Sequence, residues 1–577
     1  MKKFIYLLLI TFFCGCKEEL DLQPLDKISP ATAFKTEKDL QLYVNSFYTI
    51  LPTGNEIVRG DALSDYLVGK APDSYIVPNS FTSSMASGWS WGDLRNINYF
   101  LEHYQEAAIS EEAKNHYAGI ARFFRGMFYY NMVKRFGDVP WYDKTMDVTD
   151  TDIYKPRDSR TLVMDNVLAD LNFASANIRA TKDNTASQIT KWVALAFKSR
   201  VCLFEGTFRK YHPELSLAGT ADKWLTDASQ AAEDVIKSNQ YKINKTGTLD
   251  MSYRNLFVSE TPLADEIILA AVNNKSMRVF NDANWYYTSA TYGNRLSLIK
   301  TFVNTYLNKD GSPFTNRPDY NSVFFTEEVK NRDLRLKQTI RMGNYMRDGV
   351  AAPPDFTYTY TGYQPYKFTL DSKATDGVAE NYNSLPIIRY AEVLLNYAEA
   401  KAELHAFTAT EWNTTIKVLR ERAGIENAPF PVAADPYLKQ NYFPNMEDPA
   451  LLEIRRERGI ELVMEGFRYD DLKRWKAGKL LEMEYNGLYV PAMNVPYDLN
   501  EDGKPDVSFV TITPATKVPG VYYFLIDNTQ SKLSEGTKGN LVWLINFQRN
   551  FEDYQYFYPI PYNEIVLNPE LKQNTGW

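Results

Sequence analysis

Apolar residues recur at helical spacing in several stretches of the chain, and most of these stretches come in pairs. The first predicted helix follows Thr36-Glu37-Lys38-Asp39, and its apolar face is formed by Leu40, Val44, Phe47, Tyr48 and Leu51. Further helices are predicted at 91–107 with 110–136, at 158–178 with 189–207, at 221–239, and at 386–406 with 410–424. Gly137 and Pro140 follow the second of these helices, as expected where a helix stops.

The late pair carries a stripe of Ile, Leu and Ala in which alanines occupy close-approach positions. Short antiparallel helix pairs with alanine at their contacts are typical of tetratricopeptide-like packing, although insertions break the 34-residue period of that repeat. The stretches 240–385 and 425–577 are rich in Tyr, Asn, Pro and Gly and show no clear period. Within them, "EIILAAV" and "LVWLINF" have the length of buried strands.

These patterns predict a mainly α fold. We expect a tetratricopeptide-like helix-pair scaffold at 31–240, and a large loop-rich C-terminal part with short strands at 241–577, which includes the late helix pair (386–424). The two parts are expected to pack as one unit. Long irregular segments on a scaffold of this kind often carry function.

The N-terminus has the pattern of a secretory signal. Lys2 and Lys3 precede an uncharged apolar run, 4–13, which is too short to span a bilayer. The run ends at Cys14-Gly15-Cys16, which resembles a bacterial lipoprotein box with Cys16 as the lipid-bearing residue. We therefore expect a signal peptide at 1–15 and a lipid-anchored tether at 16–30. A disulfide or metal role for the two thiols is the alternative, but Cys202 is the only other cysteine.

Charge and hydropathy narrow the possible partners. The 577 residues carry a formal net charge of −8, and no basic stripe is present that would displace counterions from phosphates, so nucleic acid is not expected as a partner. No second apolar run approaches the roughly 20 residues of a spanning helix. The lipid on Cys16 is thus the only membrane anchor that the sequence predicts. Lys17-Glu18-Glu19, directly after it, resembles the signal that sends Bacteroidetes lipoproteins to the outer face of the outer membrane.

Five segments, taken together, resemble the SusD/RagB family of surface glycan-binding lipoproteins. They are "ARFFRGMFYYNMVKRFGDVPW", "LPIIRYAEVLLNYAEAKAEL", "VLRERAGI", "RRERGIELVMEGFRYDDLKRW" and "YPIPYNEIVLNPELKQNTGW". The resemblance implies a helical scaffold that sits as a lid on a SusC-like TonB-dependent transporter of the outer membrane. It also implies that the protein captures an oligosaccharide, or in some members a peptide, and passes it to that transporter.

No catalytic motif accompanies this resemblance, so we do not expect an enzyme. Glu461, Glu465, Asp470 and Asp471 form a carboxylate-rich stretch that invites comparison with a glycosidase. The spacing instead favours ion pairs on a helix surface, from Arg458 to Glu461 and from Asp471 to Arg474. The rival functions are a secreted glycoside hydrolase and a structural member that supports the transporter without holding a ligand.

Sugar binding needs exposed aromatic planes with polar groups around them. The first candidates are Trp285, Tyr286, Tyr287 and Tyr292, which lie among Asn, Thr and Gly. Tyr358 and Tyr360 follow, because with Phe356 they alternate with threonines as on one face of a strand. Trp89 and Asp65 are further candidates in loop-like surroundings. For each aromatic group the alternative is packing against the core.

One stretch has the spacing of a calcium loop. Asp498, Asn500, Asp502 and Asp506 occupy positions 1, 3, 5 and 9, Gly503 takes the sharp-turn position, and the Lys504 carbonyl is the expected ligand at position 7. Phe509 stands at position 12 in place of the usual bidentate Glu. A Ca²⁺ site that takes a ligand from elsewhere is one interpretation, and an acidic hairpin without an ion is the other.

Overall fold

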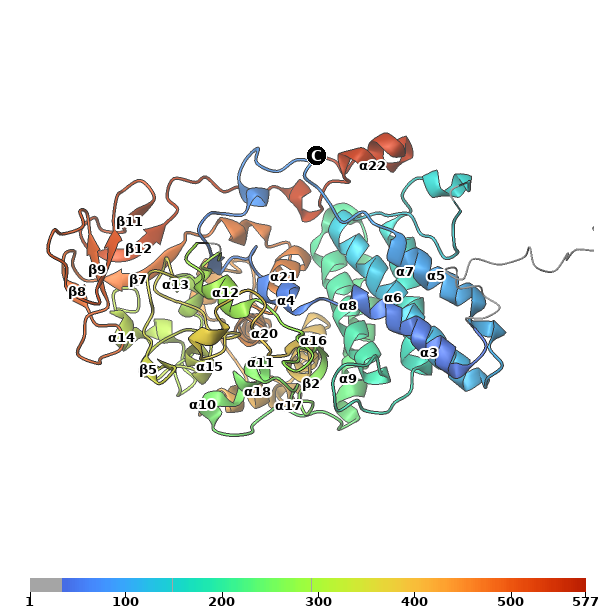
Figure 1. Cartoon of the computed structure of the whole chain (residues 1–577), viewed down its shortest axis with the longest axis horizontal. Coiled ribbons are helices and arrows are strands. Elements are labelled where there is room, and N and C mark those ends of the chain that lie inside the picture. The colour runs from blue at the N-terminus through green and yellow to red at the C-terminus, as the bar shows by residue number, and fades with distance from the viewer. Residues whose placement is uncertain (1–33, 148, 292) are drawn as a thin grey trace, which may run out of the picture.

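Long helices lie side by side across one half of the molecule, and the short strands gather at the opposite end (Figure 1). The computed structural model describes residues 34–147, 149–291 and 293–577. The long helices are α3 (Glu37–Asn45), α5 (Gly92–His103), α6 (Glu111–Phe136), α7 (Arg160–Asn177), α8 (Lys191–Tyr211), α9 (Ala221–Lys237), α16 (Tyr390–Glu403) and α20 (Pro449–Glu461). The predicted helix-pair scaffold is confirmed, although the first helix ends at Asn45 and is followed by a 3₁₀ helix at Ser46–Ile50.

Local sequence explains where these helices begin and end. Thr36 and Asp39 form a reciprocal capping box at the start of α3. The Ser110 side chain caps α6, which ends at Gly137, where φ is 79° and a residue without a Cβ is favoured. Helices α8 and α9 approach closely because Gly206 leaves room for Leu225, whose Cγ would lie 2.8 Å from an added Cβ.

The prediction of a helix pair at 386–406 and 410–424 is wrong at the start of the first helix and in the middle of the second. Leu385–Arg389 is strand β6, which pairs antiparallel with β2 (Ile267–Ala271), and α16 begins only at Tyr390. A buried apolar run has no period that separates a strand from a helix. The second helix is broken at Thr415 into α17 (Ala409–Thr414) and α18 (Ile416–Arg422).

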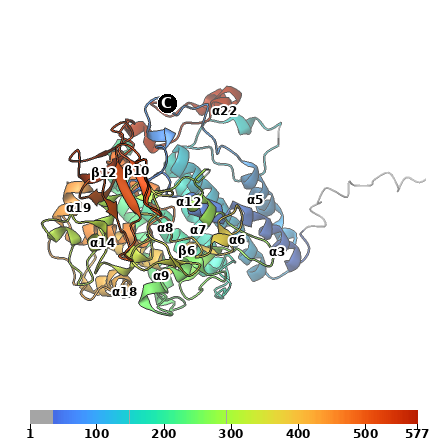
Figure 2. The same cartoon turned by 60° about the vertical axis from the view of Figure 1, so that its left-hand side comes forward.

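The C-terminal part is built from short elements. Its short helices are α10 (Leu249–Ser252), α11 (Asn255–Val258), α12 (Ala283–Thr288), α13 (Lys300–Val303), α14 (Phe325–Glu328), α15 (Leu334–Lys337), α19 (Pro436–Asn441), α21 (Arg468–Arg474) and α22 (Tyr562–Leu567). The N-terminal part has the short helix α4 (Gly54–Arg59). The remaining strands are β1 (Leu67–Val68), β3 (Ser297–Leu298), β4 (Met346–Arg347), β5 (Val350–Ala351), β7 (Asn486–Val490), β8 (Pro496–Tyr497), β9 (Val507–Val510), β10 (Tyr522–Leu525), β11 (Ser531–Leu533) and β12 (Gly539–Trp543). Two small sheets, ordered β10-β9-β8 and β11-β12-β7, lie together at one end of the molecule (Figure 1). Figure 2 turns this end toward the viewer and shows β10 and β12.

Scaffold and C-terminal part share one hydrophobic core, whose members run from Phe34 to Leu571. Buried ion pairs also join distant elements within the C-terminal part. Glu461, at the end of α20, receives Arg335 at 2.8 Å and Arg389 at 2.6 Å, and it also contacts Arg422. Burial alone would raise the pKa of Glu461, but the three guanidinium groups outweigh it and hold that pKa well below its usual range.

The carboxylate-rich stretch is therefore structural, although its predicted pairing is partly wrong. Asp471 pairs with Arg474 at 2.9 Å as expected. Arg458 does not pair with Glu461; it reaches Asp471 at 2.8 Å instead. Both pairs lie in the interior rather than on a helix surface, where breaking either would leave a buried charge without a partner.

Candidate functional site

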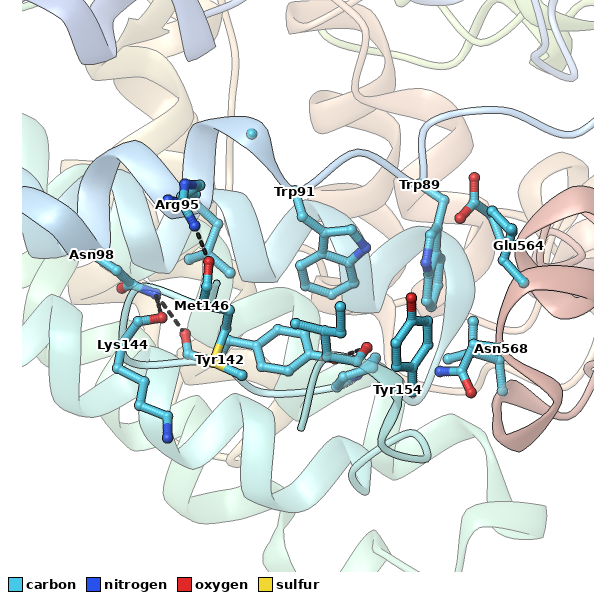
Figure 3. Close-up of a pocket in the computed structure, with 16 residues that line it drawn as sticks. Trp89, Trp91, Arg95, Asn98, Tyr142, Lys144, Met146, Tyr154, Glu564 and Asn568 are labelled. Atoms are coloured by element: carbon cyan, nitrogen blue, oxygen red, sulfur yellow. Dashed lines mark hydrogen bonds between the residues drawn. The ribbon is translucent and has the colours of Figure 1, made fainter. Parts of the chain in front are cut away.

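An aromatic cavity of about 400 Å³ opens between the start of α5, the loop 140–154 and helix α22. We define the aromatic cavity by Trp89, Trp91, Tyr142 and Tyr154, with Glu564 at its edge. Figure 3 shows the two tryptophans on one side and the two tyrosines on the other, with Glu564 and Asn568 arriving from the α22 segment. The walls thus come from three separate parts of the chain, and the rings from two of them.

Helix α5 holds the loop that forms one wall. Asn98 donates from Nδ2 to the carbonyls of Tyr142 at 3.0 Å and Lys144 at 3.2 Å. One turn earlier on the helix, Arg95 donates to the Met146 carbonyl. Because an irregular loop has backbone groups without partners of its own, these side chains fix its position.

The rings pack edge to face rather than collapsing onto one another. Trp91 lies 5.4 Å from both Trp89 and Tyr142, at interplanar angles of 80° and 85°. Trp89 also rests against Phe136 at 5.0 Å. Both tryptophans are half-buried, and Tyr154 is 52% exposed. Ring surface therefore remains open toward the cavity.

Polar groups in the wall differ in whether they are already bonded. Tyr142 donates its hydroxyl to the Ile153 carbonyl at 2.9 Å, and burial raises its pKa to about 12, so it stays neutral. Asn568 donates to the Lys155 carbonyl at 3.2 Å. Glu564 is half-buried on α22 and lines the cavity without a partner among the described residues. Flat rings with a carboxylate at their edge match the apolar faces and hydroxyl rim of a sugar.

The first predicted platform lies in the core. Helix α12 buries Tyr286 and Tyr287, and the Tyr287 hydroxyl donates to the Val58 carbonyl at 3.0 Å. Only Trp285 is partly exposed, with the rest of its ring packed against the core. The prediction of an exposed platform is wrong for Tyr286 and Tyr287. Tyr292 lies outside the described residues, and Trp285 stays a prediction.

Asparagines explain why α12 is buried. We define the asparagine cluster as Asn281, Asn284, Asn381 and Asn383, each 0% exposed. Asn284 accepts from the Leu370 amide at 2.7 Å and from Asn381 Nδ2 at 2.6 Å, and it donates to the Leu370 carbonyl at 3.0 Å. These amides supply the partners that irregular backbone lacks, so the segment can be buried without a regular sheet or helix around it.

The other predicted ligand-binding residues are either buried or line a cavity. The prediction that Asp65 contacts a ligand is wrong. Asp65 is buried, and both its carboxylate oxygens lie 2.7 Å from the Arg468 guanidinium. Phe356, Tyr358 and Tyr360 form no strand. Tyr360 is buried and stacks on Trp543 at 4.4 Å, whereas Tyr358 is half-buried and borders a second cavity. Trp89 is the predicted residue that lines the aromatic cavity.

The predicted calcium loop is the hairpin between β8 and β9. Asp498 accepts from the amides of Asn500, Glu501 and Gly503 at 2.7–3.0 Å. Burial raises the pKa of Asp506 to about 6, and the nearby carboxylates of Asp498 and Asp502 add to this effect. Within the described residues, no three His, Cys, Asp or Glu side chains gather closely enough to hold a metal ion. Calcium stays a prediction, and Phe509 at position 12 is a core residue of β9.

Sequence patterns missed Trp91, Tyr142, Tyr154 and Glu564. Trp91 stands two residues after Trp89 in "GWSWGD", a spacing that places both rings on one side of an extended segment. Tyr142 and Tyr154 lie in a Pro-flanked polar stretch, which is a loop signal. Glu564 is more than 400 residues from Trp91, and no local pattern connects the two.

Comparison with known proteins gives the family. The family model described as "SusD family" matches residues 265–577, more than half of the chain. The chain belongs to the SusD family. A second family model, described as "Starch-binding associating with outer membrane", matches residues 20–203 of this SusD family member.

Relatives and solved structures agree with this assignment. The SusD family member is similar to SusD-like protein P2 of Formosa agariphila, at 25% identity over 83% of this chain and 92% of the relative. A SusD-like protein from Bacteroides fragilis has a TM-score of 0.69 at 23% identity, covering 96% of this chain and all of that one. A SusD-like carbohydrate binding protein from the same organism has a TM-score of 0.70 at 21% identity, over 94% of this chain and all of that one. At these identities, the structures support the fold.

Proposed function

We propose that this SusD family member is a non-enzymatic binding protein that captures an oligosaccharide at the surface of the outer membrane. The observation that carries the proposal is the aromatic cavity, where Trp89 and Trp91 keep ring surface open beside Glu564. The family description "Starch-binding associating with outer membrane" and the related carbohydrate binding protein support a glycan as the ligand.

We further propose that Cys16 carries a lipid and that the protein delivers its ligand to a SusC-like TonB-dependent transporter. Cys16 lies outside the described residues, and in the part of the chain that is described no helix has the length and apolarity to cross a bilayer. Replacing Cys16 with Ser should release the protein from membranes. Purification of the native protein in mild detergent should bring a large outer-membrane barrel with it, and repeated recovery of this chain alone would contradict the partnership.

Calorimetric titration of the purified protein against a panel of oligosaccharides and short peptides tests the ligand class. We expect binding of at least one glycan and no new reducing ends after incubation with polysaccharide. Release of reducing ends would favour the hydrolase, and binding of peptides alone would favour a peptide-capturing lid. A protein that binds nothing in the panel but still recovers the barrel would be a structural subunit of the transporter.

A further inference from the structure

A second cavity, of about 680 Å³, is lined by the β4–β5 hairpin and by residues at the starts of β9 and β10. Strands β5 and β9 lie at the end of the molecule away from α5 and α22 (Figure 1). We define this charged cavity by Arg341, Tyr358, Asp355, Asp506 and Tyr522. It differs from the aromatic cavity because several ionic side chains of both signs line its wall. Arg347, Lys373 and Asp376 also reach it.

Arg341 is the unusual member of this wall. It is 6% exposed, yet no carboxylate among the described residues lies within 4.0 Å of its guanidinium, and its Nε has no hydrogen-bond partner. In the described part of the chain, every other buried arginine has a salt bridge, except Arg332, whose guanidinium donates to three backbone carbonyls. Arg341 alone among them has neither.

The neighbours of Arg341 do not neutralise it. Arg347 is already held by Asp376, with Nη1 3.0 Å from Oδ2. Asp355 accepts from the Thr357 amide at 2.8 Å, and Asp506 from the Leu499 amide at 2.7 Å. Burial lowers the pKa of Arg341, and this effect and that of the nearby Arg347 outweigh the opposing effects of Tyr345, Asp355 and Asp376. A buried guanidinium stays charged and is costly when it lacks an anion.

Ring surface lies in the same cavity. Tyr522 is 39% exposed and stacks on the buried Phe356 at 6.5 Å, which leaves its other face open. Its amide donates to the Asp506 carbonyl at 2.8 Å, which holds the two backbone segments side by side at the cavity. Tyr358 is half-buried across the cavity, where a turn bond from its amide to the Asp355 carbonyl at 2.8 Å holds it.

We infer that the charged cavity binds an acidic sugar, with Arg341 receiving the carboxylate or sulfate group and Tyr522 and Tyr358 contacting the ring. Guanidinium recognises carboxylate and sulfate oxygens through paired, charge-assisted hydrogen bonds. Asp355 and Asp506 can accept hydrogen bonds from sugar hydroxyls on the remaining wall. This inference rests on the proposed function, because it takes the ligand to be a glycan.

The test uses trigalacturonic acid, its fully methyl-esterified form and a sulfated tetrasaccharide, titrated into the mature chain by calorimetry. We expect the acid or the sulfated probe to bind at least tenfold more tightly than the ester. Arg341→Gln should remove this preference, whereas Arg317→Gln, at an exposed arginine that pairs with Asp319, should leave it intact. Tyr522→Ala should weaken acid and ester alike, by about tenfold.

Two outcomes would overturn the inference. One is that neither charged probe binds the wild type more tightly than the ester does; the other is that Arg341→Gln binds them as the wild type does. Melting temperature provides an independent check, because removal of an unpaired buried charge should leave it unchanged or raise it. A marked fall would make Arg341 a structural residue. If neutral glycans bind and no acidic preference exists, only this inference fails; if no glycan binds at all, the proposed function fails as well.

Discussion

Two aromatic segments of this protein look alike in sequence and have opposite positions in the fold. Residues 87–98 place large rings among Ser, Gly, Asn and Asp, and residues 281–288 place them among Asn, Asp, Ala and Thr. The first lines the aromatic cavity, with Trp89 and Trp91 half-buried, whereas the second buries Tyr286 and Tyr287. In the second segment, Asn284 binds the backbone around α12 and is buried together with the rings. In the first, Asn98 binds the backbone of the cavity wall, and the rings stay at the edge of the cavity. Polar residues beside aromatic rings therefore do not by themselves indicate a surface.

Truncation of Tyr287 should have the largest effect. Tyr287→Ala removes a buried ring and should lower the free energy of unfolding by roughly 3–5 kcal/mol, measured by urea unfolding. Tyr287→Phe keeps the ring and loses only the hydrogen bond to Val58, so its loss should be much smaller. Glycan affinity of the folded variant should be unchanged. A Tyr287→Ala variant that keeps its stability but binds glycan more weakly would contradict this expectation, because it would give residues 281–288 a role in ligand binding.

Asn284→Ala tests the asparagine cluster itself. The variant leaves the Leu370 amide and Asn381 Nδ2 without their acceptor, which should cost about 1–3 kcal/mol for each buried group. Asn445→Ala, at an exposed turn, is the matched control and should have no measurable effect. Equal unfolding curves for both variants would show that the cluster does not hold α12 in the core.

Sequence patterns predicted some elements of the fold and of the aromatic cavity, and missed others. The helix pairs were predictable because their apolar stripes and caps are local, as at Thr36 and Gly137. The strand β6 and the break at Thr415 were not, because burial on all sides removes the period. Of the aromatic cavity, Trp89 was predicted, but its opposing wall comes from α22. Which rings face a cavity depends on contacts between residues far apart in the sequence. The hydrogen bonds that join Asn284 to Leu370 and Asn381 are contacts of this kind.

Trp89→Ala and Trp285→Ala form a matched pair for binding. Trp89→Ala should weaken glycan binding by about 1–3 kcal/mol, the order of magnitude for stacking of a flat ring on an aromatic side chain, and it should also lower the melting temperature, because the ring packs on Phe136. Trp285→Ala should lower melting temperature and leave affinity unaltered, since part of its ring packs on the core. Calorimetry and thermal melting on both variants separate these effects. A larger affinity loss for Trp285→Ala would move the site to α12.

In the β8–β9 hairpin, too, a polar side chain accepts hydrogen bonds from nearby backbone, and the question is whether it also binds an ion. Asp498 already accepts three amides, as an asparagine of the buried cluster does. If the loop also binds Ca²⁺, the ion stabilises the native state by mass action, and Asp498→Ala should lower melting temperature only when calcium is present. The expected shift is a few degrees. Identical melting of the wild type in calcium and in chelator would leave a hairpin without an ion.

The aromatic cavity also has a consequence for the order of folding. Its walls come from residues 89–98, 140–154 and 564–571, so closing it brings together segments separated by more than 400 positions. Contacts of such long range form slowly, because the entropy of closing the intervening loop must be overcome before they contribute. Helices α5 and α6 can pack early, which covers one side of Trp89 with Phe136 and leaves the side toward the cavity in water. Tryptophan emission should then shift in a late kinetic phase, when α22 docks, which makes ligand competence one of the last properties that the folding chain acquires.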